Sequence, residues 1–352
     1  MNYILSMVGN FSRVNHGVKK AHTITCSTSI SNLPKKNYSS NSKFIMDGYE
    51  DINSTKRFEQ ARRIKGNNAR NIVFTGETEI SNFTKAEFLN NEHNKKNFIK
   101  LLSHRLRSEG YEVTECIDIG DADYTIAEAA LSLSMTTEHP VIVDAADTDI
   151  IVMLVSDDRT RENLVLQSLN KRYSISVIKS KLAKNVIDHL LVTHAISGCD
   201  GTSAIYKRAK KTSFKVIDND NDLTFLGIFK NKNATIEEIQ AAGERLMLLI
   251  YSAPASVSSL DDLRYLRYKK QVAKLSLTAG TGFGLKSLPP TSDAAKYHSF
   301  RTYYQVQKFL GNNEICPLHW CWIRDDKSDH LIPFVKDQAA APEKVLLMIS
   351  CG

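Results

Sequence analysis

Aspartates gather in three short groups between residues 119 and 203, and each group stands beside an apolar segment. One group opens an apolar helical pattern, one follows the apolar run at 141–143, and one follows a helical apolar pattern that ends near residue 197. The members are Asp121, Asp123, Asp147, Asp149 and Asp200. Carboxylates at the ends of buried strands and the starts of helices supply the oxygen ligands that a hard divalent cation requires. The groups therefore predict a site for one or two such ions, without which the carboxylates would repel one another.

These acids need a scaffold that brings strand ends and helix starts together. Apolar patterns predict strands at 43–46, 112–117 and 141–143, and helices at 84–108, 124–134 and 182–197. The first of these strands ends at Asp47, a further candidate ligand. The alternation of short strands and helices predicts an α/β fold, a doubly wound, mostly parallel sheet with helices on both faces. For any one acid taken singly, a helix cap or a solvated loop is the structural alternative.

The remaining segments divide the chain into parts. The run at 71–75 is typical of another strand, 150–155 fits a helix or a strand, and 163–169 with 172–178 predicts a hairpin. Expected helices at 203–211, 236–251, 260–275 and 292–310 make the second part mainly α. We therefore expect a poorly ordered leader at 1–42, an α/β domain at 43–215 and an α-rich, truncated region at 216–352.

Composition bounds the function. The 352 residues carry a net charge of +7 with a pI near 8.9, which permits a polyanionic partner. No apolar run approaches the roughly 20 residues of a membrane span, so no membrane role is expected. The six scattered cysteines indicate reduced thiols in an intracellular protein of the nucleus or cytoplasm. Mitochondrial targeting is disfavoured, because Arg13 is the one arginine in the acid-free first 46 residues.

The ordered acid motifs resemble those of the flap endonuclease/XPG group within the PIN-like nucleases. The motifs are GDAD at 120–123, DTD at 147–149 and GCD at 198–200, and FIMDG at 44–48 resembles the motif that carries another metal-site acid. Closer still is the likeness to asteroid-type invertebrate PIN-like proteins. Four segments carry it: DGYEDINSTKRFEQARR, FLNNEHNKKNFIKLL, HAISGCDGTSAIYK and LPPTSDAAKYHSFRTYYQVQKFL. The resemblance covers about residues 43 to 350, but the family's first strand bears an aspartate, and no acid precedes Asp47.

The resemblance implies a divalent-metal-dependent, structure-selective nuclease that hydrolyses phosphodiester bonds in branched or single-stranded DNA. It implies two Mg²⁺ or Mn²⁺ ions, held by Asp47, Asp121 and Asp123 and by Asp147, Asp149 and Asp200. Lys56 and Arg63 would offset charge on the scissile phosphate. Lys207, Arg208, Lys210 and Lys211, expected on a short helix, would grip the DNA backbone.

Several alternatives remain open beside this interpretation. Each basic group fits a solvated helix face equally, and the aromatic stripe at 297–304 fits a core better than a base-stacking platform. A degenerate PIN-like module could bind nucleic acid or a protein partner without cutting, as the missing first acid suggests. A broken reading frame left by a mobile element is the third possibility.

Overall fold

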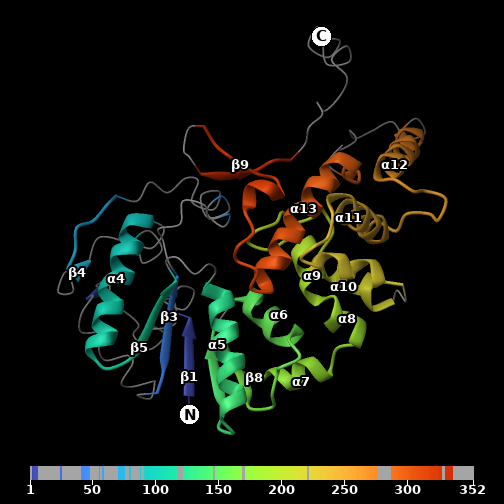
Figure 1. Cartoon of the computed structure of the whole chain (residues 1–352). Coiled ribbons are helices and arrows are strands. Elements are labelled where there is room, and N and C mark those ends of the chain that lie inside the picture. The colour runs from blue at the N-terminus through green and yellow to red at the C-terminus, as the bar shows by residue number, and fades with distance from the viewer. Residues whose placement is uncertain are drawn as a thin grey trace. The chain divides into compact units, whose positions relative to one another are not determined.

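The computed structural model describes residues 2–6, 24–25, 41–47, 55, 58, 70–75, 79–80, 88, 91–116, 122–145, 147–168, 171–219, 222–275, 287–326 and 330–335 (Figure 1). The chain forms two compact units. The first comprises Met1–Ile52 with Gln60–Ala183, and the second comprises Asn53–Glu59 with Lys184–Gly352. Along the chain, the main change from the first unit to the second thus falls between residues 183 and 184, whereas the sequence-based boundary after residue 215 lies inside helix α10 (Lys210–Asn219).

The first unit is built on a six-stranded sheet in the order β5-β3-β1-β6-β7-β8. The strands are β1 (Asn2–Ser6), β3 (Lys43–Asp47), β5 (Glu112–Cys116), β6 (Val141–Asp144), β7 (Leu164–Ser168) and β8 (Lys171–Ser174). All neighbouring pairs are parallel except β7 with β8, which form an antiparallel hairpin. A second, two-stranded ladder pairs β2 (Ile24–Thr25) with β4 (Glu79–Ile80). The predicted α/β fold with a mostly parallel sheet is confirmed.

Strand β1 lies at the centre of this sheet, between β3 and β6. Its register places Leu5 opposite Phe44 on one side and Asp144 on the other. The segment reads NYILS and contains no acid. A strand from within the range 1–42 therefore occupies the middle of the sheet and brings no carboxylate to it.

Helices cover the strands of this sheet, because each helix has an apolar face that it buries. Helix α4 (Glu92–Ser108) contacts β5, and α5 (Ala122–Thr136) contacts β1, β3, β6 and β7. Helix α6 (Thr148–Ser156) packs against α5 and against α7 (Ile175–Ser180). Strand β6 is buried along its whole length, as expected for a parallel strand covered by helices.

The structure corrects one local expectation in this unit, settles a second that was open, and refines a third. The run at 71–75 forms no strand, because Asn94 of α4 accepts a hydrogen bond from Ile72 N (2.8 Å) and donates one to Arg70 O (3.0 Å), and Val73 is 95 % exposed. The ambiguous run at 150–155 is helical. The predicted hairpin is confirmed, but its second strand ends at Ser174, whose hydroxyl caps α7.

The second unit is mainly helical, as predicted. Its helices are α8 (Lys184–Asp188), α9 (Leu190–Ile196), α10, η2 (Thr224–Lys230), α11 (Ile236–Ile250), α12 (Leu260–Leu275), α13 (Ser292–Phe309) and η4 (Pro317–Trp320). Strands β9 (Trp322–Arg324) and β10 (Leu331–Pro333) form a short antiparallel pair. The helix expected at 182–197 is interrupted at His189 and forms α8 and α9.

Helix α13 forms the core of the second unit and contacts α9, α11, η2 and η4 (Figure 1). Its aromatic side chains Tyr297, Phe300, Tyr303 and Tyr304 are buried, so the core interpretation of that stripe is correct. The Tyr303 hydroxyl donates to Asn231 O at 2.9 Å. No helix in the described part of the chain has the length and apolar character to span a membrane.

Candidate metal centre

The carboxyl edge of the parallel sheet carries two acids at strand ends, the candidate Asp47 and also Asp144. Asp47 ends β3, opposite Cys116 at the end of β5. Asp144 ends β6, opposite Gln167 of β7. Because parallel strands present their carboxyl ends at one edge, both residues belong to the edge where open α/β sheets place their ligands. The predicted ligand Asp121 lies outside the described residues.

Three more acids stand at the starts of the helices that follow β5 and β6. Asp123 is half-buried in the first turn of α5. Asp147 is the N-cap of α6, and its Oδ1 accepts from Asp149 N at 2.9 Å. Asp149, in the first turn of α6, is 5 % exposed. A helix that follows a parallel strand begins at the strand's carboxyl end, and its N-terminal dipole stabilises carboxylates there.

Asp144 is a residue that the motif-based interpretation left outside the ligand set. It is 5 % exposed, and its Oδ2 accepts a hydrogen bond from Gln167 Nε2 at 3.3 Å. Its signal in the sequence was an acid directly after the apolar run VIV. A buried carboxylate at this edge has the chemistry of a ligand or of a group that orients one.

The donor set suits a hard cation, since all of these groups offer carboxylate oxygens. Among the described residues, however, no three His, Cys, Asp or Glu side chains come close enough together to hold a metal ion. The structure thus brings Asp123, Asp144, Asp147 and Asp149 to one edge of the first unit. Asp200 belongs to the second unit.

An ion network ties α5 to the end of α6. The guanidinium of Arg159 donates to both oxygens of Glu128 (2.8 and 2.7 Å) and to both oxygens of Asp157 (3.0 and 2.9 Å). The hydrogen bonds from Arg159 lower the pKa of Glu128, and those to Glu128 and Asp157 raise the pKa of Arg159. This clamp helps to fix the two helices whose N-termini carry the acids.

In the second unit, the GCD motif forms a tight turn after α9. Gly198 has φ +108°, and Cys199 N donates to Thr202 O at 3.2 Å. Thr202 Oγ1 donates back to Ala195 O in α9. Asp200 is half-buried in this turn. The motif therefore has a structural role that is independent of any ligand.

The candidate basic residues divide into three sets. Lys56 and Arg63 lie outside the described residues. The prediction of a helix at 203–211 is wrong for residues 203–209, and helix α10 begins at Lys210. Lys207 has φ 54°, which a right-handed helix does not accommodate. Lys207 and Lys211 are exposed. Lys210 Nζ lies 2.9 Å from His194 Nδ1, and the Arg208 guanidinium lies 4.8 Å from the centroid of the Tyr251 ring.

No protein-family profile matches the chain, and no curated protein sequence matches it. Among solved structures, the chain is similar to a bacteriophage T5 flap endonuclease variant in complex with DNA and metal ions. The identity is 13 %, the TM-score is 0.42, and the match covers 79 % of this chain and 100 % of that one. It is also similar to the bacteriophage T5 protein co-crystallised with metal ions (13 %, TM-score 0.41, 89 % and 100 % covered). A third match is bacteriophage T5 5′-exonuclease with bound zinc (14 %, TM-score 0.41, 88 % and 98 % covered).

Proposed function

We propose that the protein is a divalent-metal-dependent nuclease of the PIN-like, flap endonuclease type, and that it is related to the asteroid-type proteins. The observation that carries this proposal is the set of acids at the carboxyl edge of the first unit's sheet. Asp144 and Asp149 are both buried there. Burying two carboxylates within one short strand-to-helix connection is unfavourable unless cations or hydrogen bonds offset their charge.

In this proposal Asp47, Asp121 and Asp123 hold one ion, and Asp147, Asp149 and Asp200 hold or share the second. When bound, Mg²⁺ or Mn²⁺ would supply Lewis-acid chemistry to the phosphate and to the attacking water. Lys56 and Arg63 would offset the charge that develops on the phosphate. This assignment of acids to the two ions is taken from the family resemblance.

The described residues around these acids serve as positioning groups. The N-cap hydrogen bond from Asp149 N to Asp147 Oδ1 (2.9 Å) fixes the first turn of α6. Gln167 Nε2 donates to Asp144 Oδ2 at 3.3 Å and limits the rotation of that carboxylate. Oriented carboxylates lose less conformational entropy on taking up a cation than free ones do.

For contact with the DNA backbone, the exposed pair Lys207 and Lys211 is better suited than its neighbours. Lys210 interacts with the buried His194, and Arg208 lies over the buried Tyr251, so ordering these two side chains on phosphate would cost buried contacts. The ring near Lys207 Nζ, that of Tyr206 at 5.6 Å, is itself exposed. Lysine–phosphate contacts are independent of sequence and weaken steeply with salt. Branched or single-stranded DNA is the proposed substrate.

A specific observation favours a second candidate, a module that binds nucleic acid or a protein partner without cutting. The central strand β1 has no acid, whereas the family's first strand supplies one. A nuclease with this strand would need to assemble its ions from the remaining acids.

Cleavage of labelled flap, hairpin and single-stranded DNA with Mg²⁺ or Mn²⁺ separates the two candidates. Asp149→Asn removes a buried charge at nearly constant volume. Asp158→Asn is the matched control, because the fully exposed Asp158 carboxylate lies 3.8 Å from Lys179 in the same unit. Cutting by wild type and Asp158→Asn but not by Asp149→Asn supports the nuclease. Equal cutting by all three indicates a contaminant, and salt-sensitive binding without cutting supports the second candidate.

A further inference from the structure

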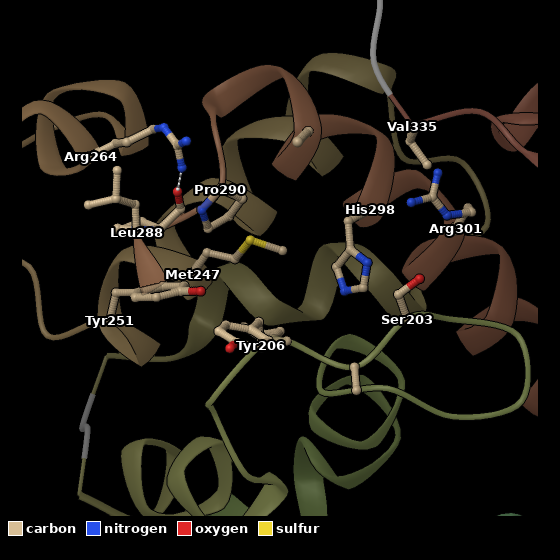
Figure 2. A pocket seen from close by; sticks show the side chains of 14 residues that line it. Ser203, Tyr206, Met247, Tyr251, Arg264, Leu288, Pro290, His298, Arg301 and Val335 are labelled. Atoms are coloured by element: carbon tan, nitrogen blue, oxygen red, sulfur yellow. Dashed lines mark hydrogen bonds between the residues drawn. The ribbon is translucent and has the colours of Figure 1, made fainter. Parts of the chain in front are cut away.

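The second unit contains a pocket with a volume of about 510 Å³ (Figure 2). The loop at 203–206, helices α11, α12 and α13 and the segment at 288–290 line it. Much of the lining is apolar or aromatic, as at Tyr206, Met247, Tyr251, Leu288 and Pro290. Its volume is in the range of sites for small organic ligands.

The charges that face this pocket are all positive. Of the described residues that line it, Arg264 and Arg301 are cationic, and none is Asp or Glu. Figure 2 shows the two arginines on opposite sides of the pocket, with His298 between them. Burial lowers the pKa of His298 to about 4, so this imidazole is neutral near pH 7. The two guanidinium groups therefore dominate the local potential.

Both arginines donate to backbone carbonyls rather than to acids. Arg301 is 4 % exposed and donates to Phe334 O, and Arg264 donates to Pro289 O. Within the described part of the chain, no carboxylate forms an ion pair with either of them. A buried guanidinium has five N–H donors, and a cation without an anionic partner is costly in a low-dielectric site.

More positive charge surrounds the Tyr251 ring at the same pocket. The Arg208 and Arg267 guanidinium groups lie 4.8 and 5.6 Å from its centroid. Arg267 also donates to Tyr251 O. Burial and the neighbouring Arg208 lower the pKa of Arg267. An anion in the pocket would relieve the repulsion among these like charges.

We propose that this pocket binds a small organic anion that joins a phosphate or a carboxylate to a flat apolar body. The half-buried Arg264 would recognise the anionic group through bidentate hydrogen bonds, and Arg301, on the opposite side of the pocket (Figure 2), would add positive potential. Tyr206, Met247 and Pro290 would contact the flat body. The pocket lies wholly within the second unit, so the proposal goes beyond the nuclease and does not depend on it.

Isothermal titration calorimetry on the full-length protein tests the proposal with two anionic probes and their neutral counterparts. Adenosine 5′-monophosphate is paired with adenosine, and 2-naphthoate with 2-naphthol. We expect at least one anion to bind with Kd at or below about 1 mM, at least tenfold more tightly than its neutral counterpart. Binding of the first anion alone assigns a phosphate ligand, and binding of the second alone a carboxylate ligand.

Three variants locate any binding that is measured. Arg264→Met and Ala294→Leu, which respectively remove a charge from the pocket and fill it, should each weaken binding at least tenfold. Arg245→Met is the control, because Arg245 of α11 pairs with Asp222 (2.7 Å) and does not line the pocket. The proposal is overturned if neither anion binds, if the neutral counterparts bind equally well, or if the pocket variants bind like wild type.

Discussion

The sharpest structural prediction concerns Gly198, the first residue of the GCD motif. An alanine Cβ at this position would lie 2.6 Å from Ala204 Cα and 2.8 Å from Ala204 N, at a backbone φ of +108°. The backbone strain costs about 1–3 kcal/mol, and the forced displacement of the facing loop costs about 1–3 kcal/mol more. Gly198→Ala should therefore destabilise the second unit by about 2–6 kcal/mol.

Two other glycines separate strain from collision. Gly110 has φ +87°, but a Cβ added there would meet no atom within 4 Å, and Gly227 has open space without an unusual φ. Gly110→Ala should cost about 1–2 kcal/mol, and Gly227→Ala should stay within about 0.5 kcal/mol of wild type. Ala204→Gly should not rescue Gly198→Ala, since the nearest atoms are backbone.

Thermal and urea unfolding followed by circular dichroism measures this series. A loss of about 3 kcal/mol lowers the melting temperature by roughly 6–12 °C in a unit of this size. If the Gly198→Ala and Gly227→Ala variants have the same melting temperature, the close approach between Gly198 and Ala204 is wrong. If Ala204→Gly restores stability, the collision is between side chains, and the backbone argument fails.

Three further predictions rest on named contacts. His298 has a pKa of about 4 in the folded protein against 6.5 in the unfolded chain. Its contribution to the free energy of unfolding is therefore complete above pH 6.5 and falls by up to about 3 kcal/mol as the pH decreases. His298→Gln should flatten the corresponding part of the urea-midpoint profile between pH 7 and 4.5. Arg159→Lys loses the paired hydrogen bonds to two part-exposed carboxylates and should cost about 1 kcal/mol, with the difference shrinking in high salt. Asp147→Ser keeps an N-cap, whereas Asp147→Ala does not, so the free energies of unfolding of the two variants should differ by about 1 kcal/mol. Both variants should weaken Mn²⁺ binding measured by electron paramagnetic resonance.

Long amphipathic segments with end signals were the predictable part of the fold. Helix α12 has the expected bounds, and α11 and α13 differ from expectation by one residue at their C-termini. Thr235 forms a capping box with Glu238, and Thr291 caps α13. Apolar periodicity and caps are local in the chain, so a single sequence contains them.

Two wrong expectations lie where a side-chain hydrogen bond or a positive backbone φ replaces regular backbone pairing. Asn94 takes the hydrogen bonds of residues 70–72, which a strand would have made with a neighbour. At 203–209, the positive φ of Lys207 and the turn after Gly198 delay the helix until Lys210. The Asn94 hydrogen bonds join residues 22 and 24 positions apart in the sequence, and propensity does not contain them.

The two sites differ in the same way. Strand-end acids could be predicted, since each follows an apolar run, and the parallel sheet then brings their positions to one edge. The pocket could not be predicted, because its arginines form no sequence motif. They converge around Tyr251 and the neighbouring cavity only in the fold, where α11, α12 and α13 pack together; these arginines are Arg208, Arg264, Arg267 and Arg301. A charge that is ordinary in the sequence becomes informative when its surroundings lack an acid.

The choice between helix cap and metal ligand, posed for each acid by the sequence, is not exclusive at Asp147. A carboxylate offers about four lone-pair positions, and the hydrogen bond from Asp149 N occupies one of them on Oδ1. The cap fixes the side-chain rotamer and holds the carboxylate at the start of α6, where the helix dipole also favours negative charge. In the proposed metal site, the same contact that stabilises the helix would also prepare this acid for a cation. A serine at this position would preserve the first role and abolish the second, which is why the two substitutions at Asp147 distinguish an acid kept for folding from one kept for chemistry.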